Sequence, residues 1–555
     1  MPSPSPRLPR TTLLLALFWL AFLVRGFWYC AMLPPWEGYD EPFHFAAVQN
    51  LAAGQGMPTA TTPVTLEVQQ SLHLLPLPWM LHFHATPGPL TPHDDFWQMP
   101  PAERAQRLDS LRSLDPASGF QPAAEPILNY ESQQTPLYYW LFAVPMRWLA
   151  ALPLLSRIYV LRLLNMLLAS AVIPLSYWIA RRVLQSKQQA LGVTALVVLL
   201  PELLIHLART ANDSLALVFY TAMLAAAIQA VRKAQSWPAW LLVGASLGCG
   251  LLSKSYALSA VPGVLAVAVA CLWQSDDTNA PRPTFAAIAA RLAAALALAA
   301  AIAGPWYLRV HRTTGSWTGI ASDSAQHHLS LVQKMAAATH VDWRSGFLSI
   351  LLSHVWFGAW SFLRIPDRLY ELVFLVIAAA LGGALVRLTR RRAPSAERRD
   401  ILVLAVFYLG FWIGLVYHVL VTFLSMGSSS SAGWYLYTAV AAEIILLTWG
   451  LQAFLPSRFV YPALAIALAA LDLYGTHALL MPYYTGLSTH VDGAVRANLP
   501  AALAHLPLIF DRLGQLHPAW LSAPVLWTWW ATYWAATLGV VLAIMALFRK
   551  PRIHS

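Results

Sequence analysis

The sequence predicts an all-α, polytopic membrane protein with about twelve transmembrane helices, within a range of roughly eleven to thirteen. Two observations support this fold class. Of the 555 residues, 58% are hydrophobic and only 11% are charged, whereas a soluble globular domain carries about 25% charged residues. The apolar residues are also gathered into runs of about 20, which is the length that an α-helix needs to cross a bilayer.

Twelve such runs follow one another along the chain. They lie near residues 11–33, 157–180, 189–207, 213–231, 237–253, 256–273, 285–308, 369–388, 401–424, 433–453, 459–480 and 524–548. Pro34-Pro35 follows the first run where a signal peptide would have a small-residue cleavage site, so we expect a membrane helix there. We expect two further apolar runs, 136–155 and 350–362, to lie in the outer interface, because prolines interrupt the first and the second is too short to cross.

The distribution of Lys and Arg predicts the orientation of the chain. About half of them fall in short segments that alternate with the long loops, and such an excess is typical of cytoplasmic loops. We therefore expect both termini in the cytoplasm, and the long loops 34–156, 309–368 and 481–523 outside. The membrane module would span 1–480, and 481–555 would hold the last outer loop, the final transmembrane helix and a cytoplasmic tail.

The composition also excludes other classes of protein. The net charge is +11, but the basic residues are dispersed between the apolar runs, so we expect membrane lipids and no nucleic acid as partners. Cys30, Cys249 and Cys271 all lie in or beside apolar runs. Three scattered cysteines predict neither a disulfide framework nor a zinc site.

A polar stretch, residues 36–45, follows the first apolar run directly. It places Asp40, Glu41 and His44 close to the membrane surface. Ionisable groups at this depth are costly and usually serve a function. A second interpretation stays open, in which the two acids simply favour the first turn of a helix that continues through Leu51.

Other charged residues lie inside the apolar runs or at their ends. Those inside the runs, for which a structural ion pair is the commoner explanation, are Arg162, Glu202, Glu443 and Asp472. Those at the predicted outer ends are Arg209, Asp213, Lys254 and Arg309. Because this second group shares the level of Asp40, it is placed to line a cavity at the outer leaflet.

Acids, an imidazole and cations at one membrane face suit the transfer of a group from a lipid phosphate to a hydroxyl. The leaving phosphate gains negative charge as its bond breaks, and fixed cations nearby stabilise that transition state. A carboxylate within reach of the acceptor hydroxyl can take its proton.

Several motifs resemble those of the GT-C glycosyltransferases, in particular the branch of protein O-mannosyltransferases and lipid A aminoarabinose transferases. Residues 36–58, with Asp-Glu-x-x-His directly after the first span, are similar to the first-loop motif of that family. Further similar segments are Gln134–Trp140, Arg209–Leu215, Gly250–Tyr256 and Gly304–Arg309. Residues 433–437 depart from the family, because Trp434 stands where such proteins often have Arg.

The resemblance implies a bundle of the GT-C type and an inverting transferase in the inner (plasma) membrane of a bacterium, with a periplasmic active site. The sugar donor would be carried on a polyprenyl phosphate, and the acceptor would be a glycan, a lipid or a protein. Asp40 would be the catalytic base, Glu41 and His44 would orient it or the donor, and Lys254 and Arg309 would hold the phosphate. The other substrate-binding residues would be Arg209, Asp213, Tyr138, Tyr139 and Tyr435.

The resemblance assigns no metal ligands. It leaves a divalent cation open, because some GT-C enzymes need one and others do not. His327-His328 is expected to belong to a polar loop, because adjacent histidines point apart.

Two other functions stay open, and so does a noncatalytic assembly subunit, since a GT-C scaffold can persist without activity. A polyprenyl-lipid flippase or transporter would show inverted repeats and charges near the bilayer midplane, and the two halves of this chain differ. A glycan polymerase or ligase would be expected to depend on a large late loop, whereas the acid pair of this chain lies in the first.

Overall fold

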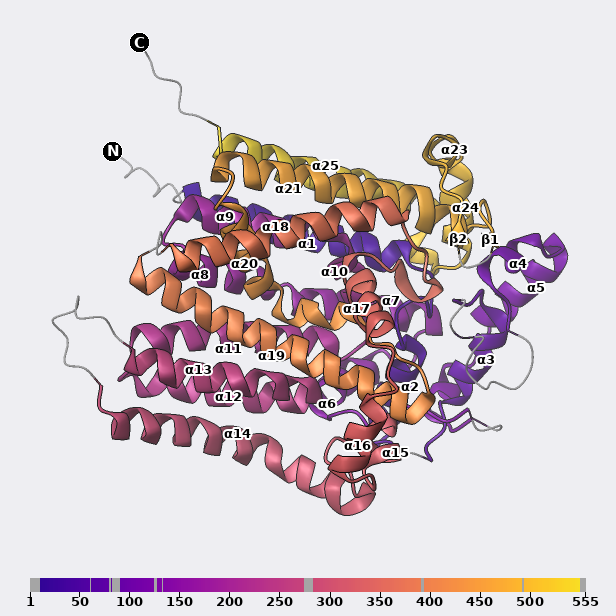
Figure 1. The fold of residues 1–555 in the computed structure, drawn as a ribbon. Coiled ribbons are helices and arrows are strands. Elements are labelled where there is room, and N and C mark those ends of the chain that lie inside the picture. Colours follow the sequence, from indigo (N-terminus) through magenta and orange to yellow (C-terminus); the bar gives the residue numbers. More distant parts are fainter. Residues whose placement is uncertain are drawn as a thin grey trace, which may run out of the picture.

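The protein is an elongated helical bundle, and the computed structural model describes residues 10–59, 61–78, 81, 90–123, 127–131, 133–273, 283–390, 394–491 and 494–549. The long helices lie side by side along the bundle (Figure 1). Helix α1 (Arg10–Met32) begins at the end of the bundle where α25 (Ala523–Leu547) finishes. We call this the terminal end, and we call the opposite end, which carries the long loops, the loop end.

Ten helical segments among the described residues are long and apolar enough to cross a membrane. Besides α1 and α25, they are α7 with α8 (Leu154–Ala169 and Val172–Val183), α11 (Asp213–Arg232), η3 with α13 (Ser255–Ala260 and Val261–Leu272), α14 (Phe285–Thr314), α18 (Asp367–Thr389), α19 (Ser395–Met426), η5 with α20 (Gly433–Ala439 and Val440–Leu451), and α21 with η6 and α22 (Ser457–Tyr474, Gly475–Leu480 and Met481–Tyr484). A bent pair, α9 (Lys187–Leu199) and α10 (Pro201–Leu207), and a shorter apolar helix, α12 (Trp237–Ser253), complete the bundle. Each predicted run contains one of these elements, so the prediction of a helical, multi-pass membrane protein is confirmed.

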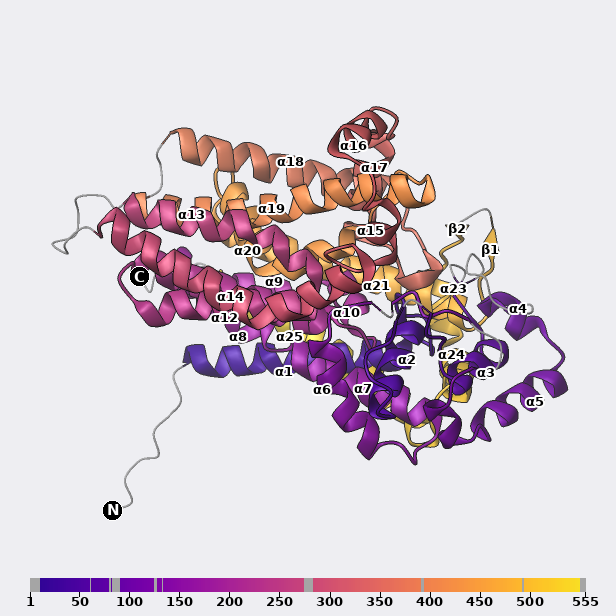
Figure 2. The ribbon, with the colours of Figure 1, turned by 90° about the horizontal axis from the view of Figure 1, so that it is seen from below.

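Three segments build the loop end (Figure 2). The first contains α2 (Glu41–Ala52), α3 (Leu66–Leu74), α4 (His93–Gln98), α5 (Pro101–Arg112), η2 (Pro116–Phe120) and α6 (Leu137–Trp148). The second contains α15 (Ala321–Gln326), α16 (Leu331–Ala338), α17 (Trp343–Val355) and η4 (Ala359–Ser361). The third contains a two-stranded antiparallel sheet of β1 (His490–Val491) and β2 (Ala494–Val495), followed by α23 (Leu499–Ala504), α24 (Leu506–Gln515) and η7 (Ala519–Leu521).

The ambiguous run 136–155 contains α6, and the run 350–362 contains the last six residues of α17 and the short η4. Helix α6 has 12 residues and α17 has 13. At 1.5 Å per residue they extend about 18–20 Å, which is less than the roughly 30 Å of a hydrocarbon core. Neither helix can therefore cross a bilayer by itself. Helix α6 packs instead against α2, the helix that follows the polar stretch 36–45.

A proline breaks the third membrane-spanning segment. Helices α9 and α10 meet at an angle of 59°, because Pro201 has no backbone N–H to continue the helical ladder. The Arg25 guanidinium of α1 donates to the carbonyls of Val198 and Leu199 beside the break. Arg25 also forms a buried ion pair with Asp472 of α21, with 2.5 Å between Nη2 and Oδ2. One side chain thus joins three distant segments.

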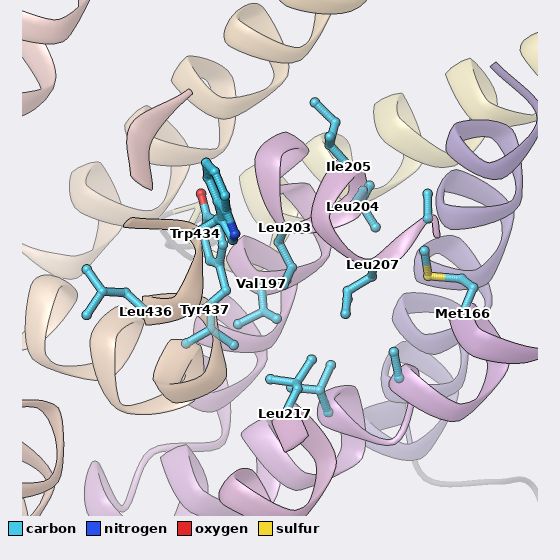
Figure 3. Packing of buried hydrophobic residues seen from close by; sticks show 14 of the residues in the cluster. Met166, Val197, Leu203, Leu204, Ile205, Leu207, Leu217, Trp434, Leu436 and Tyr437 are labelled. Carbon is cyan, nitrogen blue, oxygen red and sulfur yellow. The ribbon is translucent and has the colours of Figure 1, made fainter. Parts of the chain in front are cut away.

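Apolar packing then holds the broken helix in the middle of the bundle (Figure 3). The side chains of α10 that the figure labels, Leu203, Leu204, Ile205 and Leu207, lie among Met166 of α7, Leu217 of α11 and Leu436 of η5. All of them are almost fully buried. This packing fixes the loop between α10 and α11, which carries part of the candidate site.

The charges predicted inside the spans are all paired. Glu202 accepts hydrogen bonds from the Tyr39 hydroxyl at 2.8 Å and from two backbone N–H groups at the start of η4. Glu443 binds His354 at 2.6 Å. Arg162 and Asp472 are buried in ion pairs. The structural explanation therefore holds for these side chains.

Some sequence predictions stay untested. The predicted cytoplasmic segments 1–10, 274–283, 387–400 and 549–550 each lie partly outside the described residues. The division of the chain at residue 480, and the assignment of the loop end to the periplasm, also stay predictions.

Candidate functional site

The candidate site begins in the tight segment between α1 and α2. Asp40 has a φ of 58°, in the left-handed region, which Asp adopts more readily than most residues. Gly38 allows this segment to lie directly on the loop before α11, since a Cβ at position 38 would lie 2.5 Å from the Cβ of Arg209. Arg209 in turn donates to the carbonyl of Tyr39. These contacts hold Asp40 next to the start of α11.

Asp40 belongs to a compact acid–imidazole cluster, which we define as Asp40, His44 and Glu131. One potential ligand atom from each side chain lies within 4.8 Å of the other two. Asp40 accepts a hydrogen bond from the Tyr130 hydroxyl. His44 lies one turn further along α2, and its Nδ1 is 2.7 Å from the Tyr139 hydroxyl. Tyrosines from the end of the first loop and from α6 therefore orient two of the three groups.

The surroundings set the protonation of two members of this cluster. Burial raises the pKa of Glu131 to about 8, and the negative charge of Asp40 adds to the rise. Burial lowers the pKa of His44 well below its ordinary value, and the positive charges of Lys254 and Arg209 lower it further. At neutral pH Glu131 therefore holds a proton and His44 is uncharged.

A cationic cluster, which we define as Arg209, Asp213 and Lys254, lies beside the acids. Lys254 Nζ is 2.6 Å from Asp213 Oδ1, and Arg209 Nη2 is 2.7 Å from Asp213 Oδ2. The Lys254 ammonium also lies 4.9 Å from the centre of the Tyr435 ring and 5.4 Å from that of Tyr256, where cation–π attraction holds it. Two cations face one carboxylate, so the cluster has one surplus positive charge.

Two amide side chains join the clusters. Gln134 donates to Glu131 at 2.6 Å, and Asn212 donates to Gln134 at 3.1 Å. Asn212 also donates to the carbonyl of Ser253 at 3.0 Å, next to Lys254. The first loop, the start of α11 and the end of α12 therefore meet at one place at the loop end.

The structure brings together most of the residues predicted from the sequence. The predicted residues that belong to the two clusters or contact them directly are Asp40, His44, Tyr139, Arg209, Asp213, Lys254 and Tyr435. The remaining three, Glu41, Tyr138 and Arg309, lie elsewhere.

Glu41 points away from Asp40 into the protein. Its two carboxylate oxygens bind the Arg162 guanidinium at 2.7 and 2.5 Å, and the backbone N–H of Thr210 donates to it at 3.0 Å. Arg162 also donates to the carbonyls of Leu33 and Pro34 at 2.6 and 2.9 Å. The pair is fully buried. This ion pair clamps the turn that carries Asp40. The predicted role of Glu41, to orient Asp40 or the donor, stays a prediction.

The side chains of Tyr138 and Trp434 pack against neighbouring residues. The Tyr138 hydroxyl donates to Asn165 at 3.1 Å, and its ring is fully buried. Its predicted contact with substrate stays a prediction. Trp434 stacks on Tyr39 with 4.0 Å between ring centres. The residue that replaces the family's Arg thus supports the turn before Asp40.

Arg309 is exposed and lines a separate pocket of about 300 Å³. This pocket lies between residues 57–59 with Thr61 and the end of α14, and Gln133 and Trp306 also contribute to its wall. Arg309 lies 5.9 Å from the centre of the Trp306 ring. Its predicted phosphate contact stays a prediction.

The residues that the sequence analysis missed come mainly from the last turn of the first loop. They are Tyr130, Glu131, Gln134 as a bridging residue, Asn212 and Arg162. One signal in the sequence pointed to Glu131. It is an acid that lies just before the motif that begins at Gln134. Only the folded structure brings this acid to Asp40, about ninety positions away in sequence.

No metal ligand was expected from the sequence, but the acid–imidazole cluster can hold a cation. Two carboxylates and one imidazole are a ligand set that suits divalent ions such as Mn²⁺. Asp40, His44 and Glu131 already lie close enough together to share one ion. The residues present therefore fit a divalent cation.

We expect the binding of Mn²⁺ to release about one proton at pH 7. A ligating carboxylate must lose its proton, and the pKa of Glu131 is about 8. The release should fall toward zero above pH 9, and the affinity should rise with pH over the same range. Calorimetric titration of the protein with Mn²⁺ in buffers of different ionisation enthalpy measures the number of protons released. Glu131→Gln should abolish the release, whereas Glu103→Gln in α5 should not change it; equal release from both variants would contradict the assignment.

Among solved structures, the chain is similar to ArnT from Cupriavidus metallidurans bound to undecaprenyl phosphate, with 16% sequence identity, a TM-score of 0.39, and coverage of 75% of this chain and 67% of that one. It is also similar to the oligosaccharyltransferase of Archaeoglobus fulgidus tethered with an acceptor peptide, with 12% identity, a TM-score of 0.38 and coverage of 92% of this chain. The chain covers only 55% of that oligosaccharyltransferase. Both belong to the GT-C class that the sequence motifs resemble. The likeness is distant, and it assigns no activity to this chain.

No curated protein matches the chain. Residues 22–440, which are more than half of the sequence, match the model of the family DUF2142, described as a predicted membrane protein. The matched residues include both clusters of the candidate site. The chain therefore belongs to the DUF2142 family of predicted membrane proteins.

Proposed function

We propose that this protein is an inverting glycosyltransferase that moves a sugar from a polyprenyl phosphate to an acceptor hydroxyl. The observation that carries the proposal is that Gln134 and Asn212 join the acid–imidazole cluster to the cationic cluster at the loop end. A base and a phosphate-stabilising charge are the two groups that this reaction requires, and they lie side by side beside the ends of the spans.

Asp40 is the base in this proposal. It is half-buried, and Tyr130 holds its carboxylate by a hydrogen bond. The neighbouring Glu131 holds a proton at neutral pH because burial and Asp40 raise its pKa to about 8. Asp40 is therefore the negative member of the cluster, and the acceptor proton goes to it.

The cationic cluster receives the leaving group. The acceptor oxygen forms a bond to the anomeric carbon while the bond from that carbon to the phosphate oxygen breaks. The bonding electron pair leaves with the carrier phosphate, and the sugar inverts because the acceptor attacks the opposite face. The surplus positive charge shared by Lys254 and Arg209 stabilises the charge that grows on the phosphate.

The proposal places the reaction at the periplasmic face of the inner membrane, where the predicted orientation puts the loop end. Helix α6 lies next to α2 and carries an exposed Trp148 near its end. Aromatic side chains of this kind settle at the membrane interface. A carrier whose tail stays in the lipid can therefore bring its phosphate to the cluster without leaving the bilayer.

We expect purified protein to retain undecaprenyl phosphate, and Lys254→Ala to retain it about tenfold less. Removing the ammonium takes away the surplus charge, while Asp213 keeps its partner Arg209, so the fold should survive. Native mass spectrometry in neutral detergent measures the retained lipid. Undecaprenol, which has no phosphate, serves as the ligand control, and Lys334→Ala in α16 serves as the protein control. Equal retention of undecaprenol and undecaprenyl phosphate would contradict a phosphate site.

A further inference from the structure

A second pocket has a volume of about 480 Å³. The ends of α8 and α11, which line it, lie at the terminal end, far from α2 along the bundle (Figure 1). The last two turns of α8 and the last residue of α11 form its wall. The residues that line it are Tyr177, Trp178, Arg181, Arg182, Gln185 and Arg232. Among these described residues there are three arginines and no carboxylate.

The arginines differ in how they are held. Arg232 is fixed, because it binds Asp400 of α19 at 3.0 and 2.6 Å and donates to the carbonyl of Arg182 at 2.6 Å. The Arg182 guanidinium lies 5.2 Å from the centre of the Trp178 ring. Among the described residues, neither Arg181 nor Arg182 has a carboxylate within ion-pair distance. Within the part of the chain that the structure describes, two positive charges of the wall therefore have no carboxylate partner.

The pocket lies at the level where lipid headgroups meet a membrane protein. The membrane-spanning segments that form it end at Val183 and Arg232, and Trp and Tyr side chains favour this interfacial level. Along α8, Pro174, Trp178 and Arg182 follow one another at intervals of four residues, so they share one face of the helix. Pro174 is exposed within the span. This face therefore changes from lipid-facing to cationic over two turns.

The turn after α8 closes the pocket. Gln185 has a φ of 55°, which is uncommon for a residue with a side chain. The Ser186 side chain accepts from the backbone N–H of Gln189 at 3.3 Å and so caps α9. The neighbouring Gln188 donates to the carbonyl of Leu547 at the end of α25. Three segments thus hold the pocket in a fixed shape.

We propose that this pocket binds the phosphate of an anionic phospholipid. Guanidinium groups bind phosphate oxygens through paired N–H donors, and basic pockets between membrane helices at the cytoplasmic side bind anionic headgroups. The acyl chains lie along the exposed face of α8, and the headgroup phosphate lies between Arg181 and Arg182. This site is separate from the proposed active site and does not depend on the proposed function.

The experiment compares lipids on the purified, delipidated protein by native mass spectrometry. Phosphatidylglycerol, phosphatidylcholine and inorganic phosphate are the probes. We expect the protein to retain phosphatidylglycerol in preference to phosphatidylcholine, whose choline neutralises its phosphate. The variant Arg181→Gln/Arg182→Gln should retain phosphatidylglycerol about 30-fold less, given the interfacial attraction of two arginines to an anionic lipid.

A matched control comes from the same end of the bundle. Arg291 of α14 lies 4.9 Å from the centre of the Trp237 ring but does not line the pocket, so Arg291→Gln should retain the lipid. The thermal unfolding midpoints of both variants should match that of the wild type, which separates lost binding from lost fold. Unchanged retention in the double variant would overturn the site. If millimolar inorganic phosphate displaced phosphatidylglycerol, the pocket would be a site for free phosphate, and the assignment of a lipid ligand would be wrong.

Discussion

Replacing Asp40 by Asn should lower the rate of sugar transfer by about 10² to 10⁴, which is the range that a positioned general base contributes. The fold should survive for two reasons. Asn adopts left-handed backbone conformations at least as readily as Asp, and its side-chain oxygen can still accept from Tyr130. The lost function is then the removal of the acceptor proton. The assay uses proteoliposomes that contain a lipid-linked sugar fraction. Mass spectrometry follows the release of free undecaprenyl phosphate, which measures the rate of transfer.

Asp109→Asn is the matched control. Asp109 lies in the same loop, in α5, and its side chain is 75% exposed beside Arg112, so this variant should transfer sugar at the wild-type rate. A second measurement separates base catalysis from binding. Retention of undecaprenyl phosphate should be unchanged in Asp40→Asn, because the cationic cluster stays intact. Full transfer by Asp40→Asn would remove Asp40 from the mechanism.

Replacing Arg162 by Met should lower the free energy of unfolding by about 3–5 kcal/mol, which is the usual cost of leaving one partner of a buried ion pair without the other. The Glu41 carboxylate would stay in the protein interior with only the Thr210 N–H to bind it. The carbonyls of Leu33 and Pro34 would also each lose one of their two donors. Unfolding in mixed detergent micelles, followed by Trp fluorescence, measures the change.

The double variant Glu41→Gln/Arg162→Met should lose less than the sum of the two single variants, because it leaves no unpaired charge inside the protein. Arg112→Met serves as the surface control, since its ion pair is exposed and should contribute less than about 1 kcal/mol. The same series tests the role of Glu41. If Glu41→Gln kept wild-type stability but lost transfer, Glu41 would take part in the chemistry and its role would not be limited to clamping the turn.

The sequence predicts the membrane-spanning helices well because their cause is local. A run of about 20 apolar residues has no other stable place, and each predicted run holds a helix. Breaks inside spans were harder to predict. Leu200-Pro201 bends the third span, and the proline that causes it is visible in the sequence, but the angle depends on Arg25 and on the packing of α10 against α7, α11 and η5.

The candidate site was predictable in part. The residues carried over from the motifs after the first and fifth predicted spans, such as Asp40, His44 and Lys254, do come together, because each lies close to a helix end at the same level. The ion pair of Glu41 could not be predicted, because nothing local distinguishes Glu41 from Asp40. Only the position of Arg162, about two turns into α7 and far away in sequence, decides which of the adjacent acids turns inward.

The ion pair of Arg25 also affects how the protein inserts into the membrane during synthesis. Asp472 lies 447 residues further along the chain, so a ribosome that adds about 5–20 residues per second needs roughly 20–90 s to reach it. Until then the guanidinium of α1 has no counter-ion, and inserting an Arg at the centre of a helix costs about 2.5–3.5 kcal/mol. The first helix to enter the bilayer therefore takes its final depth only when one of the last helices has been synthesised.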